Sequence, residues 1–254
     1  DPRLSKAGIS LDQLHESGWR GAVTNATSES DWDAAAALAD AHQDWILPAF
    51  GIHPWFVRSA TDGWKERLSE RLDRWPTATI GEIGLDKWVR EPTLDEQKPV
   101  FDCQLDLSRE KGRPPMLHCL QCWGTLYDRL RDRAPWPNGF LLHSYGGPEE
   151  MVDDFLELGA YFSLSGYFAK PEKKGKLEAW KKVPMDRLLV ETDAPDMLPE
   201  SSLIIEPLSD ADGNAVNHPG NLPAIYRWAS EVYEMDLETF AGQIERNFQT
   251  LFQS

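Results

Sequence analysis

Seven short runs of apolar and β-branched residues follow one another along the chain and constrain its fold more than any other feature. They begin at residues 21, 46, 77, 113, 139, 160 and 188, so their starts are 25, 31, 36, 26, 21 and 28 residues apart. A βαβ unit needs about 30 residues, and parallel strands buried on both faces appear as continuous apolar runs. The chain is therefore predicted to be an α/β protein, a TIM-type (β/α) barrel with seven visible βα units.

The first strand of such a barrel is not evident at the start of the sequence. A barrel of this class usually has eight strands, but residues 2–18 have the pattern of a helix or a loop. We expect either that the first strand is absent from this chain or that the barrel is a seven-stranded variant. No linker and no low-complexity segment interrupts residues 1–254, so the chain is predicted to form a single domain.

The net charge limits the kind of partner that this chain could bind. The chain has 26 lysine and arginine residues against 42 aspartate and glutamate residues, a formal charge of −16. Such a chain is not expected to wrap nucleic acid with a broad basic surface. The charge is compatible with a nucleic-acid enzyme in which bound metal ions neutralise the phosphates locally.

Location and redox state are predicted from the apolar runs and the cysteines. No uncharged apolar run approaches the roughly 18 residues that span a membrane, and the first residues do not resemble a signal peptide. The three cysteines are an odd number, so we expect reduced thiols and a cytoplasmic protein. We also expect no membrane contact and no obligate protein partner. Cys119 and Cys122 have C-x-x-C spacing without a second pair, which favours structural thiols.

Ionisable residues stand where five of the seven runs end. In a (β/α) barrel the catalytic groups lie at the carboxyl ends of the strands. The residues at these positions are His53, Glu82, His118, His143 and Asp193. Each could have a purely structural role, but imidazoles and carboxylates that converge from different strands are the ligands of a divalent-metal hydrolase. We therefore predict a metal site at this rim that contains Glu82, His118, His143 and Asp193.

The same segments resemble the TatD-like metal-dependent hydrolases, a branch of the amidohydrolase-type barrels. The matching segments are GIHP at 51–54, IGEIGLD at 80–86, EQK at 96–98 with Phe101, Gln104 and Leu105, His118, His143 with Gly147, LLVETDAP at 188–195, and Asn247 with Leu251 and Phe252. They run in order from about residue 50 to the end of the chain. GIHP, GEIGLD and ETDAP are specific when they occur together.

The resemblance implies a two-metal site that hydrolyses phosphodiester bonds with a metal-activated water. It implies that Glu82 bridges the metals and that His118 and His143 bind one of them. Asp193 would bind the other metal and accept a proton from the attacking water, and His53 would contact the substrate. Carboxylate and imidazole ligands suit zinc, magnesium or manganese, so the identity of the divalent ion stays open. The implied substrate is DNA or another phosphodiester.

Two further residues are candidates for substrate binding, and two positions depart from the family pattern. Trp55 stands beside the strand end at His53 and could stack on a base. Asn221 fits an R-N-x-P segment of the family, in which Gly220 replaces the arginine. Leu120 stands where the family usually has a basic residue. Arginine is the bidentate phosphate binder, so both replacements weaken the prediction of a nucleic-acid substrate in particular.

Two alternatives to a nuclease follow from what the sequence lacks. The family has an H-x-H pair at the end of its first strand, whereas the first histidine here is the solitary His15. The chain could therefore be a catalytically silent barrel that serves as a scaffold or binding protein. It could also be a barrel hydrolase that acts on a non-nucleic ester or amide, for which the missing basic residues would be no loss.

Overall fold

The structure is a computed structural model that describes residue 4 and residues 9–253. It divides into two compact units, which are treated separately here: unit 1 comprises Asp1–Arg20 and Phe162–Asn247, and unit 2 comprises Gly21–Tyr161 and Phe248–Ser254. Each predicted run contains one strand, and the strands are hydrogen-bonded in the order β1-β2-β3-β4-β5-β6-β7. The prediction of seven successive βα units is therefore confirmed.

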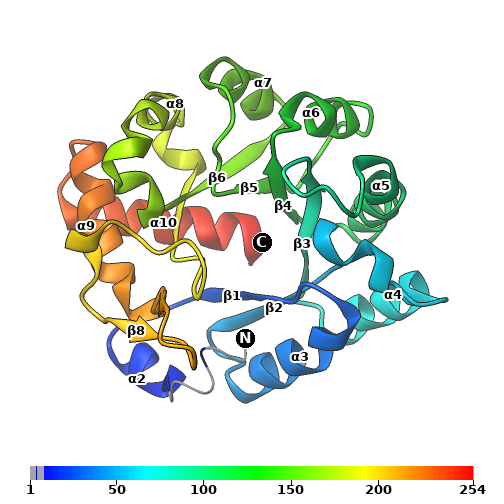
Figure 1. The fold of residues 1–254 in the computed structure, drawn as a ribbon, viewed down its shortest axis with the longest axis horizontal. Coiled ribbons are helices and arrows are strands. Elements are labelled where there is room, and N and C mark those ends of the chain that lie inside the picture. Colours follow the sequence, from blue (N-terminus) through cyan, green and yellow to red (C-terminus); the bar gives the residue numbers. More distant parts are fainter. Residues whose placement is uncertain (1–3, 5–8, 254) are drawn as a thin grey trace. The chain divides into compact units, whose positions relative to one another are not determined.

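Unit 2 holds the first five strands and the helices between them (Figure 1). Its strands are β1 (Ala22–Asn25), β2 (Ile46–Phe50), β3 (Thr79–Asp86), β4 (Pro115–Leu120) and β5 (Phe140–His143), and β6 (Ala160–Ser165) begins in it. Its helices are α3 (Trp32–Ala41), α4 (Trp64–Arg74), α5 (Leu94–Lys111), α6 (Trp123–Arg131) and α7 (Val152–Glu157), with 3-10 turns η1 (Glu29–Asp31), η2 (Pro54–Ser59) and η3 (Glu149–Met151). The strands β1 to β4 pair in parallel, and β4 pairs in parallel with β5.

The local sequence explains why these elements form. Every residue of β2 is buried, and in β3 every residue except Glu82 is buried, as expected for parallel strands covered on both faces. Helix α5 begins with a capping box, in which the Thr93 side chain and the Glu96 side chain satisfy each other's backbone N–H groups, and ends at Gly112 in the left-handed conformation. These local signals fix where β2, β3 and α5 begin and end.

Strands β3 and β4 approach each other closely beside the candidate site. Gly84 is paired with His118, and a Cβ atom on Gly84 would lie only 1.9 Å from the carbonyl oxygen of His118. Only glycine therefore allows this approach. The register of the two strands also shifts between Ile80 and Ile83, so Glu82 lies within the irregularity. Such irregularities redirect a side chain next to active sites.

Unit 1 holds the end of β6, strand β7 (Leu188–Glu191) and most of the elements that follow. Its helices are α2 (Leu11–Glu16), α8 (Leu177–Lys182), α9 (Leu222–Val232) and α10 (Leu237–Phe252), which runs into unit 2; its 3-10 turns are η4 (Gly166–Ala169), η5 (Pro171–Lys176), η6 (Met185–Arg187), η7 (Ser201–Leu203) and η8 (Pro219–Asn221). Strands β6 and β7 are parallel, and Asn247 of α10 donates hydrogen bonds to the carbonyl oxygens of Met185 and Leu188 beside β7.

Two local features of the chain bear on the sequence predictions. Before β1, the described residues 4 and 9–21 contain helix α2 and no strand, in agreement with the helix or loop predicted there. The loop after β7 contains a short antiparallel hairpin, β8 (Leu208–Ser209) with β9 (Ala215–Val216), which was not predicted. None of the described helices has both the length and the apolar character that crossing a membrane requires. The prediction of a single domain stays a prediction.

Candidate metal centre

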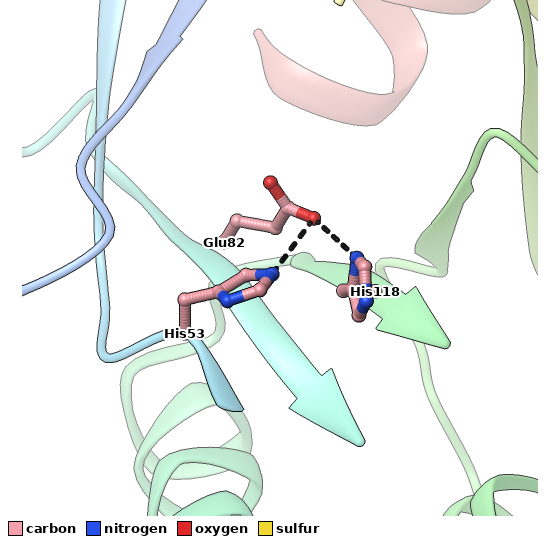
Figure 2. A group of neighbouring side chains, drawn as sticks. All are labelled: His53, Glu82 and His118. Atoms are coloured by element: carbon pink, nitrogen blue, oxygen red, sulfur yellow. Dashed lines mark hydrogen bonds and ion pairs between the residues drawn. The ribbon is translucent and has the colours of Figure 1, made fainter. Parts of the chain in front are cut away.

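Glu82 of β3 is the centre of a cluster of imidazole rings in unit 2. Its Oε1 atom lies 3.0 Å from Nδ1 of His118 and 3.7 Å from Nε2 of both His53 and His143. Figure 2 shows the Glu82 carboxylate directed between the rings of His53 and His118. The rings come from the carboxyl ends of β2, β4 and β5, so adjacent parallel strands bring them together. The structure thus unites three predicted ligands: Glu82, His118 and His143.

The charge state of Glu82 suits a metal ligand. Its side chain is 14% exposed, and burial alone would raise the pKa of the carboxyl group. The His143 ring and the hydrogen bond from His118 outweigh burial, so they hold the pKa of Glu82 well below its usual range. Glu82 is therefore a carboxylate at neutral pH, with oxygens available to a hard or borderline cation.

His118 lies between two carboxylates. Its Nδ1 faces Glu82, and its Nε2 lies 3.2 Å from Oδ2 of the buried Asp86. Burial opposes protonation, but the hydrogen bonds to Asp86 and Glu82 outweigh it and raise the pKa of His118 to about 9. If a divalent cation took the place of one proton, Asp86 would keep the hydrogen bond from Nε2–H and the Nδ1 lone pair beside Glu82 would be available to the cation. This is the carboxylate–histidine–metal arrangement of many metal sites.

His53 belongs to the cluster, but its hydrogen bonding differs from that of His118. Ligand atoms of His53, Glu82 and His118 all lie within 4.8 Å of one another, so by distance alone these three could hold an ion. The Nδ1 of His53 accepts a hydrogen bond from the backbone N–H of Trp55 at 3.3 Å. Burial lowers the pKa of His53 to about 4, so the ring is neutral and its proton is on Nε2. The Nε2–H group that faces Glu82 is thus a donor, as a substrate contact requires.

We expect His53→Ala and His118→Ala to affect metal content differently. His118→Ala removes a lone pair directed at the metal position, so it should lose most of the bound divalent ion. His53→Ala removes a hydrogen-bond donor, so metal content should be retained while turnover falls. Inductively coupled plasma mass spectrometry on both purified variants checks this. Equal loss of metal in the two variants would make His53 a ligand.

The remaining predicted site residues have different surroundings. Asp193 follows β7 in unit 1, with a positive φ of 57°, and its role stays a prediction. Trp55 of η2 is 49% exposed, and its indole Nε1 donates to Asp86 at 2.6 Å. Asn221 is fully buried in unit 1, where its Oδ1 accepts the backbone N–H groups of Ile205 and Glu206. These bonds hold the loop after β7 together, and a contact of Asn221 with substrate stays a prediction.

Asp86 is the residue that sequence reasoning missed. Its carboxylate is fully buried and accepts hydrogen bonds from His118, Trp55 and the backbone of Trp88 and Val89. Burial by itself would raise the pKa of this carboxyl group. The hydrogen bonds outweigh burial and hold the pKa of Asp86 below its usual value. A signal was available: Asp86 is four residues after Glu82 in one strand, and an even spacing places two side chains on the same face.

Two cysteines follow His118 closely in the chain: Cys119 is the next residue in β4, and Cys122 directly precedes α6. Cys119 and Cys122 are buried free thiols with sulfur atoms 3.7 Å apart, and the Cys122 thiol donates to the carbonyl oxygen of Leu85. Burial raises the pKa of the Cys119 thiol well above its ordinary value, so this thiol is protonated at neutral pH. Both thiols are thus part of the packing between β3 and β4, in agreement with the structural role predicted for them.

Comparison with known proteins connects this geometry to a family. Residues 5–253 match the family described as TatD related DNase. The chain is 28% identical over 206 residues to the metal-dependent hydrolase YjjV of Escherichia coli, covering 80% of this chain and 75% of YjjV. It is 31% identical over 211 residues to the 3'-5' ssDNA/RNA exonuclease TatD of Edwardsiella piscicida, covering 80% and 76%. The crystal structure of Escherichia coli YjjV superposes with a TM-score of 0.86 at 25% identity, over 98% of this chain and 93% of that chain. This likeness confirms the predicted TIM-type barrel class.

Proposed function

Because this chain belongs to the TatD-related DNase family of metal-dependent hydrolases, we propose that it hydrolyses phosphodiester bonds of single-stranded nucleic acid. The single observation that supports this most is the cluster of Glu82 with His118 and His143, which provides a carboxylate and imidazole donors at adjacent strand ends. The relative from Edwardsiella piscicida is named as an exonuclease on ssDNA and RNA, which supports the substrate class.

The residues of unit 2 fit a divalent ion. A divalent ion bound there would supply an activated water and positive charge for the leaving oxygen of the phosphodiester. Glu82 would contribute a negative oxygen, and Asp86 would hold the Nε2 proton of His118 so that Nδ1, after it loses its proton, could bind the ion. His53 directs its Nε2–H group into the same space, where it can donate to a phosphate oxygen. We propose one tightly bound ion on Glu82, His118 and His143.

The role of Asp193 is proposed from its motif. Asp193 of the segment ETDAP stands two residues after the end of β7, where the resemblance to the family implies a catalytic carboxylate. We propose that Asp193 is both a metal ligand and the general base that accepts the proton of the attacking water. Trp55 and Asn221 are proposed to contribute to substrate binding, Trp55 by stacking on a base.

The free thiols support a proposal about location. Cys103, Cys119 and Cys122 are all unpaired in the structure. Disulfides are rare where glutathione and thioredoxin keep thiols reduced. We propose that the protein acts in such a reducing compartment, the cytoplasm.

A set of hydrolysis assays tests the proposed substrate. The purified chain is incubated with single-stranded DNA, double-stranded DNA, bis(p-nitrophenyl) phosphate and an aryl carboxylic ester, with Zn²⁺, Mn²⁺ or Mg²⁺ and with a chelator. We expect metal-dependent cleavage of single-stranded DNA that exceeds cleavage of the duplex and disappears with the chelator. Turnover of the ester without cleavage of any phosphodiester would instead support the non-nucleic hydrolase. No turnover despite bound metal would support the silent barrel.

A further inference from the structure

Exposed apolar side chains gather around the carboxyl ends of β3 and β4 in unit 2. Trp88, two residues after β3, is 70% exposed; Trp55 is 49% exposed; and Leu120, the last residue of β4, is 39% exposed. Exposed tryptophans are costly in water, and apolar clusters of this kind mark binding sites. Leu120 is the register partner of Asp86, and its carbonyl oxygen accepts the N–H of Lys87 at 2.9 Å. The three residues therefore lie around one strand end, where Asp86 is the register partner of Leu120 and bonds Trp55 and the backbone of Trp88.

The Asp86 carboxylate connects these residues to the candidate metal centre. Its Oδ1 accepts the backbone N–H of Trp88 at 2.7 Å, and its Oδ2 accepts the indole N–H of Trp55 at 2.6 Å. The same Oδ2 lies 3.2 Å from Nε2 of His118. Gln97 in turn accepts the backbone N–H of Asp86 at 2.7 Å. One buried carboxylate thus bonds the backbone of Trp88, the indole of Trp55 and the proposed metal ligand His118.

The charges beside Trp88 indicate an anionic ligand with flat, apolar groups. Trp88 lies in the sequence Lys87-Trp88-Val89-Arg90-Glu91, in which Lys87, Arg90 and Glu91 are exposed, and Glu91 is paired with Arg58. Aromatic side chains interleaved with basic ones are typical of proteins that bind single-stranded nucleic acid, because bases stack on the rings while cations contact the phosphates. A duplex keeps its bases stacked on each other, so an unpaired base is the group that this surface can accept.

We propose that Trp88, with Trp55 and Leu120 beside it, is a stacking subsite for an unpaired base of the nucleic-acid strand whose phosphodiester is cleaved. This inference rests on the proposed function and extends it, because it assigns the recognition of a single strand to Trp88. Stacking would also take over part of the binding that the family obtains from basic residues, which are replaced here by Leu120 and Gly220.

Equilibrium binding of two labelled oligonucleotides tests the subsite separately from catalysis. One is a single-stranded oligothymidylate, and the other has the same length and backbone but abasic sugars. Fluorescence anisotropy is measured with Ca²⁺ present, for the wild type, Trp88→Ala, Trp88→Phe and Leu237→Ala. Leu237 is the matched control, since it is a 41% exposed apolar residue at the start of α10. Trp88 is largely exposed and its backbone N–H is unchanged by substitution, so the fold should be retained.

We expect Trp88→Ala to raise the Kd for oligothymidylate about tenfold, with Trp88→Phe closer to the wild type and Leu237→Ala unchanged. The abasic strand should bind the wild type and Trp88→Ala equally weakly. Equal binding of oligothymidylate by wild type and Trp88→Ala, an equal loss for both strands, or no binding of either strand by the wild type overturns the subsite.

The two proposals can fail independently of each other. Base-dependent binding through Trp88 without any hydrolysis of nucleic acid supports the subsite and contradicts the proposed function. Hydrolysis of single-stranded DNA that is unaffected by Trp88→Ala, together with unchanged binding, supports the proposed function and contradicts the subsite.

Discussion

Glu82→Gln is expected to abolish most metal binding and to lower kcat for phosphodiester hydrolysis by on the order of 10³-fold. Glutamine has nearly the same shape as glutamate, but its amide carries no negative charge and is a poor ligand for a divalent cation. The three imidazoles that face Glu82 would then surround a neutral group. The measurements are metal content by mass spectrometry and initial rates with single-stranded DNA at saturating metal.

Glu91→Gln is the matched control for this change. Glu91 is an exposed glutamate of the segment between β3 and α5, and it forms an ion pair with the exposed Arg58. Surface ion pairs contribute about 0–1 kcal/mol, so this variant should keep its metal, its activity and its melting temperature. Normal metal content and activity in Glu82→Gln would refute the proposed centre, whatever the control shows.

Asp193→Asn is expected to lower kcat by about 10²–10⁴-fold, the contribution typical of a general base. Asparagine is isosteric with aspartate, but it cannot accept the proton of the attacking water and it is a weaker metal ligand. The far-ultraviolet circular dichroism spectrum and the melting temperature should match those of the wild type. Because Glu82 and His118 are unchanged, the variant should still bind one ion, which isothermal titration calorimetry can count.

Asp196→Asn provides the comparison for Asp193→Asn. Asp196 is an exposed aspartate three residues further along the same loop, so its substitution makes the same change of charge and shape. We expect its activity to stay within about twofold of the wild type. Full activity in Asp193→Asn would exclude this residue as the base, and an equal loss in both variants would indicate a general effect of charge in the loop.

The sequence by itself determined the order of the strands and which strand ends carry ionisable groups. The strands were predictable because burial on both faces imposes a local pattern of continuous apolar residues, visible in β2 and β3. The clustering of Glu82, His118 and His143 was predictable because parallel strands in sequential order place their carboxyl ends together, and their role as metal ligands stays a prediction. This reasoning needs only spacing and topology, so it does not depend on the details of packing. The role of Asp193 is still only a prediction.

Only the tertiary structure decided how these groups are bonded. Glu82 lies within a register shift of β3, and the 3.3 Å bond from the backbone of Trp55 sets the tautomer of His53. The spacing from Glu82 could have placed Asp86 on the same face of β3, but its hydrogen bonds could not be predicted. Its partners are 2, 3, 31 and 32 residues away and meet only when β3, β4 and η2 are packed. Hydrogen bonds between distant segments depend on atomic distances, and no sequence pattern specifies those distances.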